Sequence, residues 1–593
     1  MNNTIFIFIA LLSSILSATD IKIQTSSGIT SSYFKSGVEN WDDIPYAKPP
    51  VGNLRWKAPR KIINSNKILL AKDNNFCVQR PSGMGGSQGE GYFSGTEDCL
   101  YLDIKAPKNS LKKALPVMFW IHGGGNTSGL KDLYDFSKMA KRHNVVIVSV
   151  NYRLGPFGWF THPAIQGLQE GLDASSNFGT LDIIEALRWV QSNISLFGGD
   201  PQNVTIFGES AGGHNVFSLL SSQKAKGLFH KAISQSGYTT TIQKSLAYKQ
   251  DIYSPTSSYT SFNIVNKVLE EKAINRDQVS IEKSELRGIL LGLSAEDFFS
   301  HYAQRQSYEE IPLLTADGIV IPIAGLKKAL SNKSNVNIVP TMAGSNLDEV
   351  KLWLASAKYF ADLKFSPIGL LFNIPKIEIN DEPAFEIFNK YRSAAWKLRG
   401  VDGPIRSLKS AGNNNLYAYR YDWDDHRRIF IADFKKLIGA AHATEIPLLT
   451  GDTKLTDGYG FLIYPRGPSK RFLSKNMMRF WTNFAKNGVP GDSTNSVDWN
   501  PYGNLKDDSS SFMILDNRAN LKMSSDNISF ETLVKGLYAE TAVNDLEKCV
   551  VLFQMLTFVG DDLYDEYIND YPGDCSRSES EKFIKENASF IDY

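Results

Sequence analysis

The sequence is poor in metal-binding residues and carries no excess of charge. Four cysteines and eight histidines are spread over 593 residues, without a Cys-x-x-Cys pair or a histidine cluster, so we expect no metal site. Sixty-four basic residues balance sixty-three acidic ones, which leaves no net field to attract nucleic acid or an anionic membrane. We therefore expect neither a bound metal nor a nucleic-acid partner.

Long apolar runs and internal repeats are also missing. Beyond the N-terminal segment, the longest apolar run covers residues 549–559 and is broken by Gln554 and Thr557. It is shorter than the roughly 20 residues that a membrane-spanning helix needs, so we expect no transmembrane segment. No low-complexity block or linker divides the chain, and its length suffices for a large hydrophobic core.

Residues 1–18 resemble a secretory signal peptide, although they lack an early lysine or arginine. An apolar run at 5–16 is followed by Ser17 and Ala18, which predicts cleavage near Ala18. A membrane anchor is the alternative, but about a dozen apolar residues cannot span ~30 Å of hydrocarbon. We expect a protein that is secreted or enters the lumen of the secretory pathway.

The four cysteines suit an oxidising compartment. Three pairings of Cys77, Cys99, Cys549 and Cys575 are possible. The simplest joins Cys77 to Cys99 and Cys549 to Cys575, so that each bond closes a short loop. Each bond would restrict the unfolded chain by about 3 kcal/mol.

Sequons for N-glycosylation occur at six positions beyond residue 18. Asn126 and Asn203 fall in stretches that we expect to be buried. The better candidates for carrying a glycan are Asn332, Asn527 and Asn587.

The stretch 203–213 organises the rest of the chain. An apolar run at 204–207 leads into Gly-Glu-Ser-Ala-Gly at 208–212, and an amphipathic stretch follows. A strand, this pentapeptide and a helix form a nucleophile elbow, in which glycines allow the sharp turn that exposes Ser210. A chance match or a plain turn is the alternative, and the flanking strand and helix argue against it.

A second glycine-rich segment precedes the elbow. Residues 115–121 have the pattern of a buried strand and end in His-Gly-Gly-Gly at 122–125. Bare N–H groups in such a loop can form an oxyanion hole, although alone the segment could be a flexible turn. A buried strand at 145–150 and an amphipathic helix at 180–196 follow, and this alternation indicates a mostly parallel sheet covered on both faces.

Further strands are predicted at 231–234, 338–342, 416–423 and 512–515, the last being the final strand. Between them, the polar stretch 238–308 is predicted to be an insertion of cap helices. The organisation that we expect is a signal peptide at 1–18, an α/β domain at 19–545, and a disulfide-bonded C-terminal extension at 546–593.

A serine nucleophile needs a base, and five histidines follow Ser210. His214 lies on the elbow helix, and His230 lies before a strand. His301 lies in the polar insertion, and His426 lies in a charged loop that we expect to be solvated. His442 alone lies among small residues just past a core strand, where a loop can reach over the carboxyl edge of the sheet. We predict His442 as the base.

The acid is expected between the serine and the histidine in the chain. Asp348 and Glu349 lie side by side after the predicted strand 338–342. Spacing alone does not choose between them.

The chain resembles the type-B carboxylesterases, the family of carboxylesterases, cholinesterases and fungal lipases. The likeness runs from about residue 25 to 520, over segments 44–56, 97–102, 122–125, 151–155, 208–213, 235–237, 344–349, 439–445 and 480–485. It implies an α/β-hydrolase fold, a mostly parallel central sheet with inserted cap helices. It also implies Ser210 as nucleophile, His442 as base and Glu349 as acid. It implies that the N–H groups of Gly124, Gly125 and Ala211 form the oxyanion hole. It also implies a disulfide between Cys77 and Cys99.

The departures from this family bear on the substrate. Cholinesterases hold the choline cation against a tryptophan in the loop that matches 77–99, whereas this loop has only Tyr92 and Phe93 as aromatic residues. Leu352 and Trp353 stand where that subfamily has two aromatic residues. Choline esters are therefore disfavoured. The pair Cys549 and Cys575 has no counterpart in the family.

These observations predict a secreted serine hydrolase that cleaves small-molecule or lipid carboxylic esters through an acyl-enzyme, without a metal or cofactor. The alternative is a non-catalytic adhesion, storage or crystal-forming protein on the same fold. Such proteins commonly lose the serine or the histidine, and this chain has both. The sequence carries no signal for the oligomeric state.

Overall fold

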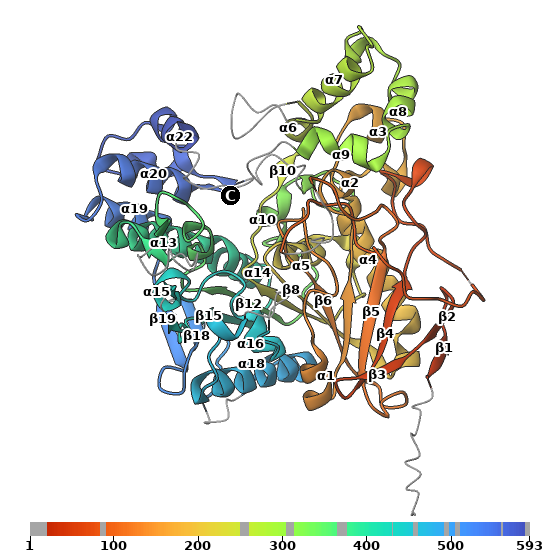
Figure 1. The fold of residues 1–593 in the computed structure, drawn as a ribbon, viewed down its shortest axis with the longest axis horizontal. Helices are drawn as coiled ribbons and strands as arrows, with labels where there is room; N and C mark the ends of the chain where they lie inside the picture. Colours follow the sequence, from red (N-terminus) through yellow and green to blue (C-terminus); the bar gives the residue numbers. More distant parts are fainter. Residues whose placement is uncertain are drawn as a thin grey trace, which may run out of the picture.

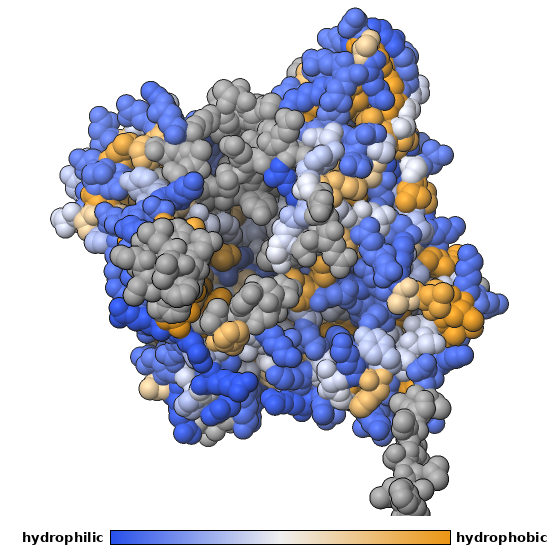
Figure 2. Space-filling view, viewed as in Figure 1, coloured by the Kyte–Doolittle hydropathy of each residue, from blue (hydrophilic) through white to orange (hydrophobic). Residues whose placement is uncertain are grey.

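A computed structural model describes most of the chain (Figure 1). The described residues are 20–63, 65–83, 91–249, 260–303, 314–364, 376–429, 431–454, 460–491, 497–503, 510–558 and 561–586. The predicted signal peptide at 1–18 and the sequon at Asn587 lie outside them. Among the described helices, none is both long and apolar enough to cross a membrane. On the face seen in Figure 2, apolar residues occur as separate patches among hydrophilic ones.

A sheet of eleven strands forms the centre of the described structure. Neighbouring strands from β18 to β7 are parallel, and the pairs at both edges are antiparallel. The mostly parallel sheet is thus confirmed. In spatial order the strands are β19 (Lys522–Asp526), β18 (Ser510–Leu515), β15 (Leu416–Tyr421), β12 (Thr341–Asn346), β9 (Lys231–Gln235), β8 (Gly199–Glu209), β6 (Leu115–Ile121), β7 (Val146–Val150), β5 (Tyr101–Pro107), β4 (Val38–Pro45) and β3 (Tyr33–Lys35).

Strand β6 is apolar along its whole length because both faces of the sheet are covered there. On β6, Val117, Phe119 and Ile121 belong to one hydrophobic core. Met118 and Trp120, which alternate with them, belong to a second core on the opposite face. All five side chains are fully buried.

Helices from different parts of the chain close these two cores (Figure 1). The first core includes residues of α4 (Phe178–Asn193) and α5 (Ala211–Ser221). The second includes residues of α1 (Ser137–His143), α16 (Ile446–Thr450) and α18 (Pro468–Asn487). The sheet therefore forms the middle of three layers, as the alternation of strands and helices predicts.

Two strand predictions were wrong in detail. The strand predicted at 338–342 begins at Thr341, because Ile338 is exposed and Pro340 has no N–H for a ladder bond. The strand at 512–515 is not the last one, since β19 pairs with β18 as an antiparallel edge strand. Its sequence, Lys-Met-Ser-Ser-Asp, lacks the apolar pattern of a buried strand.

The insertion predicted at 238–308 is mainly helical where it is described, but it also contains the short strand β10 (Ile242–Gln243). It forms a group of helices to one side of the sheet's carboxyl edge (Figure 1). The helices are α6 (Lys244–Lys249), α7 (Ser261–Glu271), α8 (Lys283–Leu291) and α9 (Ala295–Ala303).

The C-terminal helices share a third core with the body of the protein. Phe385 and Phe388 of α13 (Glu382–Lys397) pack in one cluster with Val550 and Val551. The other elements of this cluster are α19 (Phe530–Tyr538), α20 (Asp545–Leu556) and α22 (Arg577–Glu586). Residues on both sides of the predicted boundary at 545/546 thus contribute to the same core.

Candidate active site

Ser210 lies in the sharp turn between β8 and α5. Its backbone has φ 57° and ψ −121°, a conformation that a non-glycine residue rarely adopts. A Cβ atom at Gly212 would lie 2.0 Å from the carbonyl oxygen of Ile121, and one at Gly208 would lie 2.6 Å from the carbonyl carbon of Gly212. Only glycine lets α5 approach β6 this closely, which explains the spacing of the elbow motif.

The elbow backbone is fixed on both sides of the serine. The N–H of Ser210 donates to the carbonyl of Gln235 at the end of β9, and its own carbonyl accepts from His214 on α5. Ala211 is the first residue of α5, so its N–H group lies at the positive end of an eleven-residue helix. Ser210 remains partly exposed, and a substrate can reach it.

The glycine loop after β6 lies directly against the elbow. Gly124 and Gly125 have φ of 97° and 63° and are partly exposed. A Cβ atom at Gly123 would lie 2.7 Å from Oε2 of Glu209 and 3.1 Å from Cβ of Ser210. The loop therefore needs glycines both for its conformation and for its close approach to the serine.

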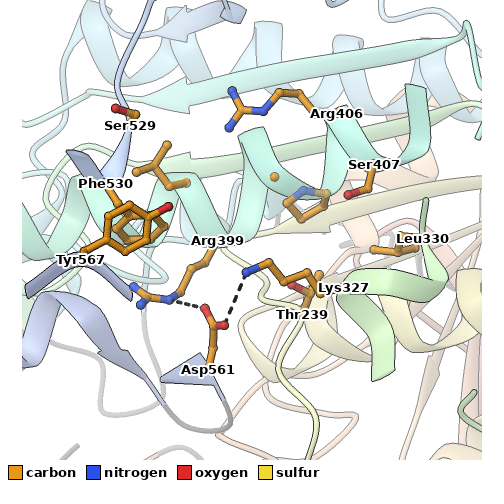
Figure 3. Close-up of a pocket in the computed structure, with 13 residues that line it drawn as sticks. Thr239, Lys327, Leu330, Arg399, Arg406, Ser407, Ser529, Phe530, Asp561 and Tyr567 are labelled. Carbon is orange, nitrogen blue, oxygen red and sulfur yellow. Dashed lines mark hydrogen bonds and ion pairs between the residues drawn. The ribbon is translucent and has the colours of Figure 1, made fainter. Parts of the chain in front are cut away.

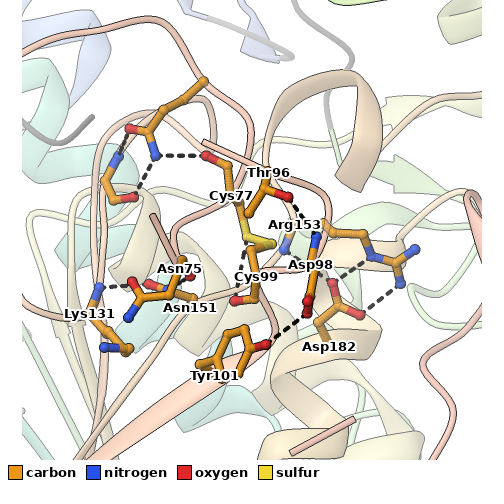
Figure 4. Close-up of a disulfide and its surroundings, with 12 residues drawn as sticks. Asn75, Cys77, Thr96, Asp98, Cys99, Tyr101, Lys131, Asn151, Arg153 and Asp182 are labelled. Atoms are coloured by element: carbon orange, nitrogen blue, oxygen red, sulfur yellow. Dashed lines mark hydrogen bonds and ion pairs between the residues drawn. A yellow bond between two sulfur atoms is a disulfide. The ribbon is translucent and has the colours of Figure 1, made fainter. Parts of the chain in front are cut away.

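The predicted disulfide between Cys77 and Cys99 is present, and its segment is bonded to the glycine loop (Figure 4). The fully buried amide of Gln79 donates to the carbonyls of Cys77 and Gly129 and accepts from the N–H of Gly129. Gly129 directly follows the turn at 124–128, in which the N–H of Ser128 donates to the carbonyl of Gly124. The disulfide loop thus helps to hold the loop that carries Gly124.

His442 and Glu349 are in direct contact. Nδ1 of His442 lies 2.6 Å from Oε2 of Glu349, and the N–H of His442 donates to the carbonyl of Glu349. The other carboxylate oxygen, Oε1, accepts from the N–H of Asn346 at 2.7 Å. Glu349 is fully buried and His442 is 6% exposed. The carboxylate is therefore fixed from both sides and can orient the ring.

Asp348, the other candidate acid, faces away from this contact. Its Oδ1 accepts from the side-chain amide of Asn389 at 2.6 Å, and its Oδ2 accepts from the N–H of Ala440 at 2.9 Å. Lys351 lies 3.5 Å from Oδ1. Asp348 thus supports the loop that leads to His442 instead of touching its ring.

The second ring nitrogen of His442 faces the elbow. Nε2 lies 3.1 Å from Oε1 of Glu209, close enough for an ion pair but not aligned as a hydrogen bond. This buried nitrogen has no hydrogen-bond partner among the described residues, and it does not bond the Ser210 hydroxyl. Catalytic hydrogen bonds are often long before substrate binds.

Three buried carboxylates surround His442 and shift its titration. Burial alone would lower the pKa of His442, but the negative charges of Glu209 and Glu349 outweigh this effect and raise the pKa to about 9. Burial raises the pKa of Glu209 to about 8, against the effect of the His442 cation. The third carboxylate, Glu445, is fully buried, and burial raises its pKa too.

Glu445 joins the strands around the site and was not predicted. Its carboxylate accepts from Gln235 at 3.1 Å and from Asn346 at 2.8 Å. Trp481 donates to Gln235 in turn, at 3.0 Å. These residues lie within segments that carry the family resemblance, 235–237, 344–349, 439–445 and 480–485. Their position in these segments is the sequence signal that could have pointed to this network, because buried polar side chains need hydrogen-bond partners.

Two tryptophans pack against the ring of His442. The ring centroids of Trp353 and Trp396 lie 5.0 Å and 4.9 Å from that of His442, and 5.7 Å from each other. Trp396 also donates to the carbonyl of Ser236, at 3.1 Å. One side of the site is thus apolar and aromatic.

Two of the other histidines have partners of their own. His214 contacts the carbonyl of Thr240 at 2.8 Å, and burial lowers its pKa to about 4. The expectation of a solvated His426 was wrong: it is 8% exposed and contacts the carbonyls of Gly439 and Ile463. The contact with Gly439 supports the loop that carries His442.

The other predicted positions make no direct contact with His442 among the contacts described. Cys549 and Cys575 form the second predicted disulfide. Asn332 and Asn527 are exposed and Asn126 is buried, as expected, whereas Asn203 is partly exposed. Among the residues that the structure describes, no group of three or more His, Cys, Asp or Glu side chains is arranged to hold a metal ion.

Comparison with known proteins places the chain among esterases. The model of the carboxylesterase family matches residues 22–365 and 403–531. The chain belongs to the carboxylesterase family. Para-nitrobenzyl esterase of Bacillus subtilis (strain 168) is 32% identical to it over 511 residues, which cover 81% of this chain and 92% of that protein. Carboxylesterase 1E of Rattus norvegicus is 32% identical over 497 residues, covering 75% and 81%.

Solved structures agree with this assignment. A thermophilic PNB esterase superposes with a TM-score of 0.63 at 28% identity, over 85% of this chain and 97% of that one. EstA of Aspergillus niger, at 20% identity, shares the fold with a TM-score of 0.65, over 87% and 97%. The carboxylesterase therefore has the predicted α/β-hydrolase fold, and it is a carboxylic ester hydrolase.

Proposed function

We propose that this carboxylesterase cleaves esters with a Ser210–His442–Glu349 triad and an oxyanion hole formed by the N–H groups of Gly124, Gly125 and Ala211. The observation that carries the proposal is the 2.6 Å contact between Nδ1 of His442 and the buried carboxylate of Glu349. It leaves Nε2 directed at the elbow without a hydrogen-bond partner, as a general base for an adjacent serine requires.

In the first half-reaction, Oγ of Ser210 attacks the ester carbonyl carbon while Nε2 of His442 accepts the hydroxyl proton. The negative oxygen that forms is stabilised by the N–H groups of Gly124, Gly125 and Ala211. The dipole of α5 adds to this stabilisation because its positive end lies at Ala211. His442 then returns the proton to the departing alcohol, and the acyl group stays on Ser210.

In the second half-reaction, water attacks the acyl-enzyme while His442 again serves as the base. The acid is released and Ser210 recovers its proton. Throughout, Glu349 keeps the ring in one orientation and stabilises the imidazolium that forms in each half. The two tryptophans beside His442 support an uncharged, apolar ester group as substrate, from a small molecule or a lipid.

Secretion forms part of the proposal. The pattern of residues 1–18 and the two disulfides favour export through an oxidising compartment. Asn332 and Asn527 are exposed and available to glycosylating enzymes there. Mass spectrometry of the secreted protein would test the cleavage near Ala18 and the glycans together.

The triad is tested with purified protein, p-nitrophenyl esters of increasing chain length and a p-nitrobenzyl ester, the substrate named for the Bacillus relative. Ser210→Ala is expected to lower kcat by about 10⁴ to 10⁶-fold and to abolish labelling by an organophosphate. Ser222→Ala is the matched control, because the Ser222 hydroxyl at the end of α5 is buried and makes no hydrogen bond to any described residue. Wild-type protein that neither cleaves these esters nor reacts with the organophosphate would favour the non-catalytic alternative.

A further inference from the structure

The C-terminal extension reaches back to the aromatic side of the active site. After α20, a short hairpin pairs β20 (Thr557–Phe558) with β21 (Asp561–Asp562). The ring of Phe558 packs against Trp396 with a centroid distance of 5.3 Å and against Tyr238 with one of 5.4 Å. Phe558 is partly exposed, so its ring still presents surface that the core does not cover.

These aromatic contacts continue to His442. Trp396 packs against both Phe558, at 5.3 Å, and His442, at 4.9 Å. Tyr238, which contacts both Phe558 and Trp396, stacks on His214 of the elbow helix at 4.4 Å. One ring therefore separates Phe558 from the histidine that the proposed function makes the base.

A buried arginine fixes the hairpin in this place. The guanidinium of Arg399, which follows α13, donates to the carbonyls of Met555 and Leu556 at 2.7 Å and 2.9 Å. It also contacts Asp561 on the second hairpin strand at 2.8 Å, and Lys327 lies 3.6 Å from the same carboxylate (Figure 3). One guanidinium thus binds the last residues of α20, directly before β20, and a carboxylate on β21, so these bonds fix the hairpin on both sides of Phe558.

The second disulfide holds the same unit together. Cys549 lies on α20 and Cys575 lies just before α22. Between them, Tyr564 donates to the carbonyl of Cys575 and packs against Phe553 of α20, with ring centroids 5.9 Å apart. The disulfide therefore constrains the polypeptide that carries the hairpin.

This arrangement is separate from the part of the chain that matches the family. The family model covers residues 22–365 and 403–531. Trp396, Arg399 and Phe558 all lie outside these ranges. The family match therefore assigns no role to these three residues.

We propose that Phe558 is a specificity-determining residue, through which the disulfide-bonded extension forms one wall of the ester-binding site and limits the size of the ester group that lies against Trp396. The proposal rests on the function proposed above, since it assumes that esters react beside His442. Phe558 acts by supporting Trp396 and by filling the space next to it. Its removal opens that space, which favours bulkier esters over small ones.

The test compares kcat/KM for a long and a short ester in wild type, Phe558→Ala and Phe558→Trp. One series varies the acyl chain of p-nitrophenyl esters, and a second varies the alcohol of alkyl acetates, so that the affected half of the substrate is identified. Phe558→Ala is expected to raise the long-to-short ratio by about tenfold in one series. Phe558→Trp is expected to lower the ratio in that series.

Phe553→Ala is the matched control. Phe553 lies on α20, shortly before the hairpin, and its ring faces Tyr564 and Arg577, so the ratio should stay within about twofold of wild type. If Phe558→Ala does not fold, Phe558→Leu replaces it in the test and should shift the long-to-short ratio in the same direction. An unchanged ratio in folded, active Phe558 variants would overturn this inference alone. Absence of wild-type turnover and of Ser210 labelling would overturn the proposed function, and the inference with it.

Discussion

The Nε2 atom of His442 lies 3.1 Å from a carboxylate oxygen of Glu209, the residue that immediately precedes Ser210. Glu209 is 1% exposed, and burial raises its pKa to about 8. Burial would lower the pKa of His442, yet the charges of Glu209 and Glu349 raise it to about 9. The charge of Glu209 therefore favours the imidazolium form of His442, which in the proposed mechanism forms when His442 accepts a proton, and disfavours the neutral form that would accept it.

Replacing Glu209 with glutamine is expected to move the acid limb of the pH–kcat/KM profile to lower pH. The negative charge of Glu209 raises the pKa of His442, so its removal lowers that pKa. At a pH above the pKa of Glu209, about 8, where the wild-type carboxylate is charged, a larger fraction of His442 is then neutral and available as the proposed base. The profile for p-nitrophenyl acetate, which reports groups of the free enzyme, measures the shift. A limb that stays in place or moves to higher pH would contradict this account.

Glu349→Gln and Asp348→Asn should behave in opposite ways. Glutamine at 349 loses the charge that orients and stabilises His442 across the 2.6 Å contact, so kcat/KM should fall by about 10³ to 10⁴-fold with little change in stability. Asparagine at 348 disturbs the contacts to Asn389 and Ala440 and should cost about 1–3 kcal/mol of unfolding free energy. Its activity should remain within about tenfold of wild type. Kinetic measurements and urea unfolding of both variants test these expectations. Near-normal turnover by Glu349→Gln would rule out Glu349 as the acid.

Much of the fold could be predicted because the central strands carry their own local signal. The run at 115–121 is apolar throughout and matches β6, since a strand covered on both faces needs no polar side. β19 carries no such signal. Four of its five residues are charged or hydroxylic and none of the five is buried, and it forms because its backbone pairs with the edge of β18.

The candidate site likewise has residues that could be predicted from local sequence and residues that could not. Ser210 and the glycine loop are predictable because a strained turn and a close backbone approach need particular residues at fixed spacings. The contacts of Glu209 and Glu445 depend on which side chains meet across strands, and Phe558 meets Trp396 across 162 positions of sequence. No local periodicity encodes such pairs.

Gly212→Ala should destabilise the protein, whereas Gly288→Ala should not. A Cβ atom at Gly212 would lie 2.0 Å from the carbonyl oxygen of Ile121, so α5 must move away from β6. We expect a loss of about 1–3 kcal/mol or more, together with lower activity because Ser210 moves with the helix. Gly288 lies within α8 and has open space at its Cβ position, so alanine there should stabilise by up to about 1 kcal/mol. Thermal unfolding of the two variants compares them, and equal effects would show that the elbow tolerates a side chain at 212.

The two disulfides should contribute differently to activity. Cys77 and Cys99 hold the segment whose Gln79 bonds the turn behind Gly124, so Cys77→Ser/Cys99→Ser should lower both stability and kcat for the smallest ester. Cys549→Ser/Cys575→Ser opens a loop with a sequence separation of 26 and should reduce the unfolding free energy of the extension by about 3 kcal/mol. The glycine loop has no bond to this region among the contacts described, so turnover of p-nitrophenyl acetate should largely persist. Unfolding curves and acetate kinetics of both double variants measure the difference, and equal losses of kcat would show that the extension also supports the oxyanion loop.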